Sequence, residues 1–250
     1  MVRSLLIRGM LAGFLAGLLA FGVARILGEP SVDRAIAFEE QAHKAAHPGH
    51  QHEDEPELVS RAVQRGMGLF TGVVVYATAF GGLFALVFAF AYGRIGNLSP
   101  RATSALLAAA AFVALVLVPD IKYPPNPPAI GEAETIGRRT ALFVAMIAVS
   151  LAAMLVALAA RRRLIVRLGV WNASLAGGCV FFVLIVVAML VLPAIDEVPA
   201  RFPADLLWRF RITSIGIEAT LWTAIGLAFG PLADAVLRSE QRGQWSRQRV

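Results

Sequence analysis

All four histidines of this 250-residue chain lie in one short polar segment, HKAAHPGHQHEDE, residues 43–55. Neutral imidazole is the commonest protein ligand for first-row transition metals, and carboxylates add charge and further coordination. The segment therefore predicts a site that captures a divalent transition metal. Its expected ligands are His43, His47, His50, His52 and Glu40.

The spacing of these ligands depends on a helix before them. If residues 31–46 are helical, Glu40, His43 and His47 share one face, because they are separated by three and four residues. Pro48 disfavours the helical conformation at His47, so this helix is expected to end there. The alternative is an ordinary solvated loop, since a histidine-rich tract is a compositional signal only.

A second candidate is a carboxylate inside an apolar stretch. Glu218 lies in SIGIEATLWTAIG. An ionisable side chain near the centre of a bilayer costs about 2.5–3.5 kcal/mol on insertion scales, and such residues usually face a bundle interior or a watery cavity. Glu218 is therefore predicted to lie on or near an ion path. In the alternative it is a packing contact, either protonated or paired with Arg211.

Prolines dominate a further polar segment, residues 120–139. Pro119 is expected to end a helix, and the prolines within 124–128 hold the chain near polyproline II. Asp120 and Asn126 offer oxygen ligands there, beside a pore mouth, and complete the predicted transport path. A stiff connector that only fixes helix spacing is the alternative.

The elements that must position these residues are membrane helices. Hydrophobic residues make up 58% of the chain and charged residues 16%, with a mean hydropathy of +0.68, which is far more apolar than the soluble average. One crossing needs about 20 mostly apolar residues. Six windows qualify, although the third is short enough to leave a count of five open: 5–27, 67–92, 103–119, 140–160, 172–192 and 212–230. The prediction is an all-α, polytopic transmembrane helix bundle, residues 1–250 forming a single integral membrane domain.

Small residues recur at a regular spacing in the first window. Gly9, Gly13 and Gly17 lie four residues apart and form one flat stripe on a helix. Such a stripe lets a second membrane helix approach closely. The alternative is that glycine is simply common in membrane helices.

Basic residues indicate the orientation. Lys and Arg concentrate in the short connections 94–101 and 161–167 and in the tail 231–250, so the positive-inside rule places these segments and the N-terminus in the cytoplasm. The opposite, extracytoplasmic side carries the His- and acid-rich loop 28–66 and the Pro-rich loop 120–139. The net charge of +6 fits this topology and contact with anionic lipid headgroups. We expect a multi-pass protein of the bacterial cytoplasmic (inner) membrane.

Several functions are excluded by what the sequence lacks. No histidine falls in an apolar window, so a membrane di-haem site and an H-E-x-x-H zinc protease have no ligands. There is no P-loop, so any energy comes from an ion gradient, the membrane potential or another subunit. No soluble basic face points to nucleic acid. The windows hold no clustered nucleophile and base, so we expect no enzyme, no catalytic residue and no permanently bound cofactor.

Four segments of the first 140 residues carry unusual motifs: GEPSVDRAIAFEE (28–40), SRAVQRGMGLFTG (60–72), GGLFALVFAFAYGRIGNLSPRA (81–102) and VPDIKYPPNPPAIGEAETIGRRT (118–140). The most specific are the Gly-Glu-Pro exit from the first helix and Lys-Tyr-Pro-x-Asn-Pro-Pro followed by Gly. In these features the chain resembles CbtA, a family of predicted cobalt transporter subunits. The resemblance implies an integral membrane protein with about five spans that takes up cobalt for cobalamin supply, beside a small histidine-bearing partner, CbtB.

Two functions stay open. In the first, the chain is a transporter subunit for a divalent transition metal, cobalt above all, which the His/Glu loop captures outside and which passes on or near Glu218. In the second, it is a non-transporting membrane scaffold or assembly subunit for a partner that carries the pathway. The expected partners are the lipid bilayer, further chains in a homo- or hetero-oligomer, and a CbtB-like subunit.

Overall fold

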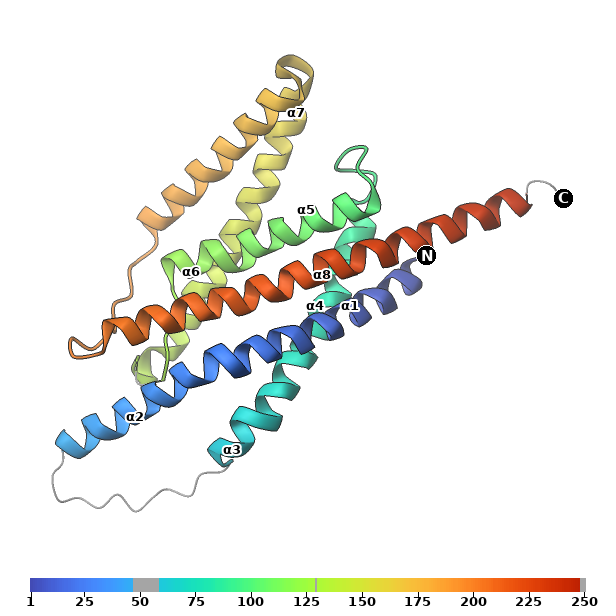
Figure 1. The fold of residues 1–250 in the computed structure, drawn as a ribbon. Coiled ribbons are helices and arrows are strands. Elements are labelled where there is room, and N and C mark those ends of the chain that lie inside the picture. The colour runs from blue at the N-terminus through green and yellow to red at the C-terminus, as the bar shows by residue number, and fades with distance from the viewer. Residues whose placement is uncertain (47–58, 129, 248–250) are drawn as a thin grey trace. The chain divides into compact units, whose positions relative to one another are not determined.

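The computed structural model describes residues 1–46, 59–128 and 130–247, and every element in these ranges is helical. The all-α prediction is confirmed. The elements, drawn in Figure 1, are α1 (Val2–Val23), η1 (Ala24–Gly28), α2 (Glu29–Ala46), α3 (Arg61–Val63), η2 (Gln64–Gly68), α4 (Leu69–Ala91), α5 (Pro100–Phe112), η3 (Val113–Leu117), α6 (Val118–Lys122), η4 (Ala133–Thr135), α7 (Ile136–Val191) and α8 (Ala204–Arg247). Three of the η segments are π-helical, and η4 is a 3-10 turn.

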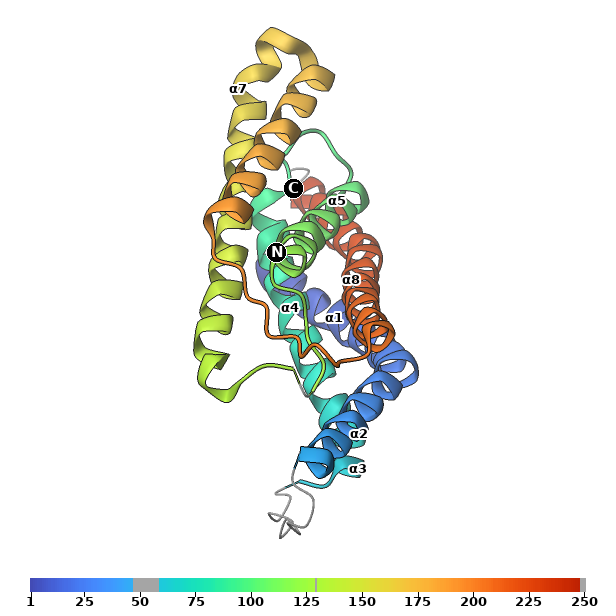
Figure 2. The same cartoon turned by 90° about the vertical axis from the view of Figure 1, so that its left-hand side faces the viewer.

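Within the described ranges, five helices are long and apolar enough to cross a membrane: 2–42, 61–91, 100–122, 136–191 and 204–240. The fourth of these is α7, and it contains two of the six apolar windows. Its backbone leaves the helical conformation at Gly169, where φ is +74°, a value that favours glycine. Figures 1 and 2 show the two arms of α7 running back alongside each other. The six windows therefore lie on five helices.

Two helices continue through prolines that the sequence suggested as end points. The first helix does not leave at Gly-Glu-Pro but runs on to Ala46, and the third continues past Pro119 to Lys122. A proline has no backbone N–H and its ring crowds the carbonyl four residues earlier. Both of these carbonyls lie in π-helical segments, η1 before Pro30 and η3 before Pro119. The wider turns relieve the conflict locally, so the helices persist.

The chain forms two compact units, and unit 1 consists of residues 1–111 and 212–250. The glycine stripe of α1 packs directly on α4 in this unit. A Cβ atom on Gly17 would lie 2.8 Å from the Cβ of Ala77, and one on Gly13 would lie 3.0 Å from the Cα of Gly81. The first distance is one that real Cβ atoms essentially never show and the second is tighter than nearly all of their contacts, so the predicted close approach of a second helix is confirmed.

Helix α8 packs on α5 and α4 in unit 1 through a hydrogen bond and aromatic contacts. The hydroxyl of Ser104 on α5 donates to the carbonyl of Gly226 at 2.7 Å. The ring of Phe229 meets the rings of Phe84 and Phe88 on α4 edge to face, at centroid distances of 5.5 and 5.1 Å. Aromatic pairs in this geometry stabilise beyond their buried area.

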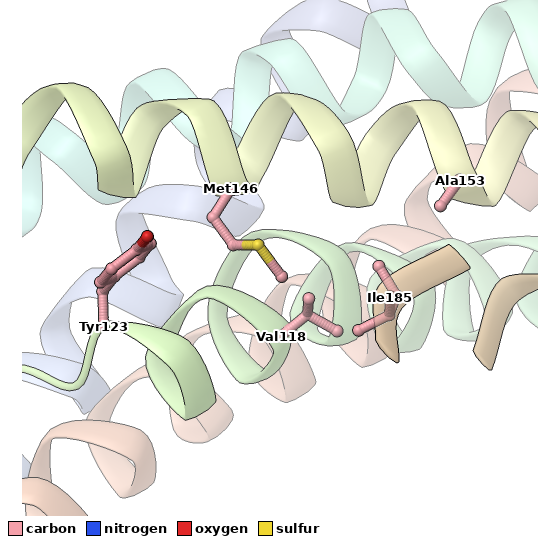
Figure 3. Close-up of a cluster of buried hydrophobic side chains, with 5 residues drawn as sticks. All are labelled: Val118, Tyr123, Met146, Ala153 and Ile185. Atoms are coloured by element: carbon pink, nitrogen blue, oxygen red, sulfur yellow. The ribbon is translucent and has the colours of Figure 1, made fainter. Parts of the chain in front are cut away.

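Unit 2 consists of residues 112–211. Its apolar core joins both arms of α7 to η3 and α6 (Figure 3). The buried members of this core are Val118, Tyr123, Met146, Ala153 and Ile185. The arms also meet near their turn, where Arg161 Nε donates to Ser174 Oγ at 2.9 Å. This hairpin brings the two ends of α7 to one end of the unit.

Candidate ion-binding cavity

A cavity of about 610 Å³ opens at that end of unit 2. Its walls come from the last turn of α6, the Pro-rich segment after it, the first turns of α7, the segment that follows α7, and the start of α8. Apolar wall residues include prolines and Phe143. The charged and amide side chains of the wall are Asp120, Asn126, Arg139, Asp196, Glu197 and Arg211.

The end of α6 is fixed to the end of α7 by two hydrogen bonds. Lys122 Nζ donates to the carbonyl of Met189 at 2.7 Å, and the hydroxyl of Tyr123 donates to the carbonyl of Pro193 at 2.8 Å. Met189 belongs to the last turn of α7, where carbonyl groups have no partner within the helix. Burial raises the pKa of Tyr123 above its ordinary value.

The wall between these anchors is extended because of its prolines. Pro124 and Pro125 both line the cavity and have no N–H to donate. A proline-rich stretch stays near polyproline II and does not collapse into a helix. Asn126 therefore stands beyond the end of α6, on a wall whose shape is fixed by the backbone.

One ion pair closes the wall across the ends of the α7 hairpin. Arg139 Nε lies 3.3 Å from Glu197 Oε2, and both side chains are partly buried. Arg139 also donates to the carbonyl of Glu132 at 3.5 Å, and the backbone N–H of Glu132 donates to Glu197 Oε2 at 3.4 Å. The backbone of Gly131, with φ at +107°, passes so close to the guanidinium that a Cβ atom there would collide with it. Gly131 is favoured by its φ, and a Cβ atom there would push the guanidinium of Arg139 aside.

The second arginine of the cavity binds an amide. Arg211 Nη2 donates to Asn126 Oδ1 at 2.8 Å, and Asp196 lies within electrostatic reach of the same guanidinium. Among the described residues, Asp120 is in no ion pair. Three carboxylates against two guanidinium groups leave the cavity with one net negative charge.

The charged and amide groups of the cavity are spread around its wall. Over the described ranges of the chain, no three His, Cys, Asp or Glu side chains lie close enough together to hold a metal. The cavity instead offers separated oxygen atoms around a space much larger than an ion. Such a site suits a cation that keeps its water.

Comparison with family models places the chain. The model of the family described as "Probable cobalt transporter subunit (CbtA)" matches residues 2–234, nearly the whole length. The chain belongs to the CbtA family. No curated protein and no solved structure matches it.

The cavity of this CbtA-family chain brings together two of the three residues that we predicted for the transport path. Asp120 and Asn126 both line it. Glu218 lies in unit 1 instead, partly buried on α8 and within electrostatic reach of Tyr76 on α4. The roles of all three in transport stay predictions.

The predicted histidine site falls mostly outside the described residues. Residues 31–46 do form the expected helix, as part of α2, and Glu40 is exposed on it. His43 is on the same helix, but its side chain is not among those described. His47, His50 and His52 lie outside the described residues. Metal capture by this tract stays a prediction.

Sequence reasoning missed the four remaining charged residues of the cavity: Arg139, Asp196, Glu197 and Arg211. A signal for three of them was present. Arg139 precedes one apolar window of α7 and the Asp-Glu pair follows the other, at similar distances from the turn at Gly169. If the two windows form a hairpin with equal arms, these opposite charges must meet.

Sequence reasoning also missed a buried carboxylate in unit 1. Glu29 is only 7% exposed and its Oε2 lies 2.6 Å from Arg61 Nη2. The same nitrogen lies 3.0 Å from Asp33 Oδ1. These contacts join the start of α2 to the start of α3.

Proposed function

We propose that this chain is the subunit through which a divalent transition metal ion enters a cobalt transporter, and that the cavity of unit 2 receives the ion. Family membership supports the transporter subunit. The observation that carries the rest is the gathering of Asp120, Asn126, Asp196 and Glu197 around one cavity with a net negative charge. Oxygen atoms around a negative site attract a divalent cation from solution.

The ion enters the cavity with its water. A divalent ion with six waters needs roughly 200 Å³, at about 30 Å³ for each water. The cavity, at about 610 Å³, accommodates it with room for exchange. Carboxylate and amide oxygens then contact the bound waters rather than the metal, which fits the absence of a three-ligand set among the described side chains.

In this proposal the histidine tract collects metal before the cavity does. Its ligands are Glu40, His43, His47, His50 and His52. The gathering of all four histidines just after Glu40, which is exposed on α2, supports this role. The orientation that we propose, with the N-terminus in the cytoplasm of a bacterial cell, puts both the tract and the cavity on the outer face of the cytoplasmic membrane.

Glu218 is proposed as a later point on the path. It lies in a span, partly buried, and intramembrane carboxylates commonly mark ion routes. The small histidine-bearing CbtB-like subunit is the partner that we propose for the complete pathway, and cobalamin synthesis is the proposed use of the cobalt.

The test is reconstitution in liposomes. Purified chain alone and chain with its small partner are each incorporated, and entry of cobalt-57 is followed against protein-free vesicles. We expect entry with the pair, a sharp fall with Glu218→Ala, and a higher half-saturating cobalt concentration after deletion of residues 43–55. Entry that is indifferent to the presence of this chain would refute the proposal.

The alternative function is that the chain only scaffolds a partner that carries the pathway. The same liposomes separate the two. A scaffold with its cavity carboxylates neutralised still supports full entry, whereas an ion-conducting subunit does not.

A further inference from the structure

Both arginines of the cavity are bound to oxygen atoms that a cation would use. Arg139 Nε is 3.3 Å from Glu197 Oε2, and Arg211 Nη2 is 2.8 Å from Asn126 Oδ1. Each guanidinium thus occupies the place that a bound cation would take beside these oxygen atoms. A cavity built only to bind cations tightly has no use for two fixed positive charges in its wall.

We infer that Arg139 and Arg211 are built-in competitors of the transported ion, which keep its binding in the cavity weak enough for release. The inference rests on the proposed function of the cavity as the receiving site for a divalent cation. It adds two residues that determine affinity. It also explains why the ion keeps its water, because the arginines occupy oxygen atoms that would otherwise bind the metal.

Charge arithmetic supports this role. Without the two guanidinium groups the three carboxylates would give the cavity three negative charges instead of one. A divalent ion in such a site would be held firmly, yet conduction requires binding that is favourable enough for entry and weak enough for exit. The arginines also keep Glu197 and Asn126 occupied, so that these oxygens are not free to replace the water around the ion.

The two arginines are placed differently, and this predicts unequal effects. Arg139 competes for a carboxylate, and it is also held by the carbonyl of Glu132 and packed against Gly131. Its charge therefore stays in the wall even when an ion draws Glu197 away. Arg211 competes for a neutral amide, so its displacement costs only a hydrogen bond to a neutral acceptor. Arg139 should have the larger influence on affinity.

The experiment measures cobalt binding rather than transport. Full-length protein in detergent, with His43, His47, His50 and His52 replaced by Gln so that the tract does not contribute, is dialysed to equilibrium against cobalt-57 ions. Arg139→Gln should bind cobalt roughly tenfold more tightly, because one positive charge a few ångströms from a divalent ion is removed. Arg211→Gln should bind more tightly by a smaller factor.

Three control variants test whether the change in cobalt affinity is electrostatic. Arg139→Lys keeps the charge and should bind cobalt almost as the parent does. Arg201→Gln removes an exposed arginine of the same unit that does not line the cavity, and should change nothing. The double variant Arg139→Gln, Glu197→Gln removes one charge of each sign, and its affinity should return close to that of the parent.

Unchanged or weaker cobalt binding by Arg139→Gln overturns the inference, and if this variant does not fold, Arg211→Gln decides by the same criterion. The proposed function fails separately. If the parent protein binds no cobalt in its cavity, the receiving site itself is refuted. If binding is lost with Asp120→Asn but unaffected by both arginine variants, the receiving site stands and only the role of the arginines as competitors is refuted.

Discussion

The α1–α4 interface of unit 1 and the cavity of unit 2 differ in what lies between their helices. In the interface, glycines bring two backbones so close that no side chain fits between them. In the cavity, prolines hold the backbone apart and charged side chains line the space that is left. The interface lies between two helices, whereas much of the cavity wall comes from the segments that follow α6 and α7.

The energetics of the two regions differ accordingly. Close helix packing in a bilayer depends on van der Waals contact and short separation, since lipid is as apolar as the helices themselves. The cavity depends on electrostatics, in which charges of both signs nearly cancel. The interface should therefore respond to added volume, and the cavity should respond to changed charge.

The largest effect is expected from adding volume to the interface. Gly81→Leu puts a side chain where a Cβ alone would lie 2.7 Å from the Cα of Gly13. Overpacking of this kind costs about 1–3 kcal/mol and occasionally more, and here the obstacle is backbone, which cannot rotate away. We expect loss of most folded protein from the membrane, measured as yield and as thermal unfolding in detergent.

The matched control lies on the same helix. Gly72 is also in α4, and nothing would contact a Cβ atom there within 4 Å. Gly72→Leu should fold as the parent does. If both leucine variants were lost equally, the glycines of α4 would matter for the helix itself and not for its contact with α1.

The next effect is expected from changing charge in the cavity without changing volume. Asp120→Asn removes one of three carboxylates while keeping the shape of the side chain. A single charge a few ångströms from a divalent ion in watery surroundings is worth about tenfold in affinity. Cells that express the chain with its partner should need about tenfold more cobalt for half-maximal uptake of cobalt-57.

Asp205→Asn is the control for this charge. Asp205 is exposed at the start of α8, outside the cavity. Its replacement should leave the cobalt dependence of uptake as it is. Both variants should unfold at the parent's temperature, so that a difference between them reports ion binding alone.

The contrast between the regions also explains how much could be foreseen. All six apolar windows are helical, the stripe from Gly9 to Gly17 packs on a second helix, and Asp120 and Asn126 share one cavity. Each of these follows from spacing within one short segment. Periodicity and composition are local signals, and they were sufficient here.

The remaining features depend on contacts between distant segments. Arg139 meets Glu197 only because α7 turns back near Gly169. The sequence indicated a short connection between the two windows, but not which charges the two arms bring together. Pro119 suggested a helix end because proline has no backbone N–H. The π-helical turn η3, which lets the helix continue past Pro119, could not be read from the proline itself. The helices could therefore be predicted from the sequence, whereas the pairing of charges across the α7 hairpin could not.

The smallest effect is expected at Tyr123, which connects the cavity wall to the apolar core of unit 2. Tyr123 packs in that core and donates to the carbonyl of Pro193. Tyr123→Phe keeps the ring and leaves the carbonyl without its partner, which costs about 1 kcal/mol. For a chain of this size that lowers the melting temperature by about 2–4 °C. Tyr92→Phe, whose ring stacks on Phe88, serves as the control in the same detergent. A shift for Tyr92→Phe as large as that for Tyr123→Phe would mean that the bond to Pro193 does not stabilise the cavity wall.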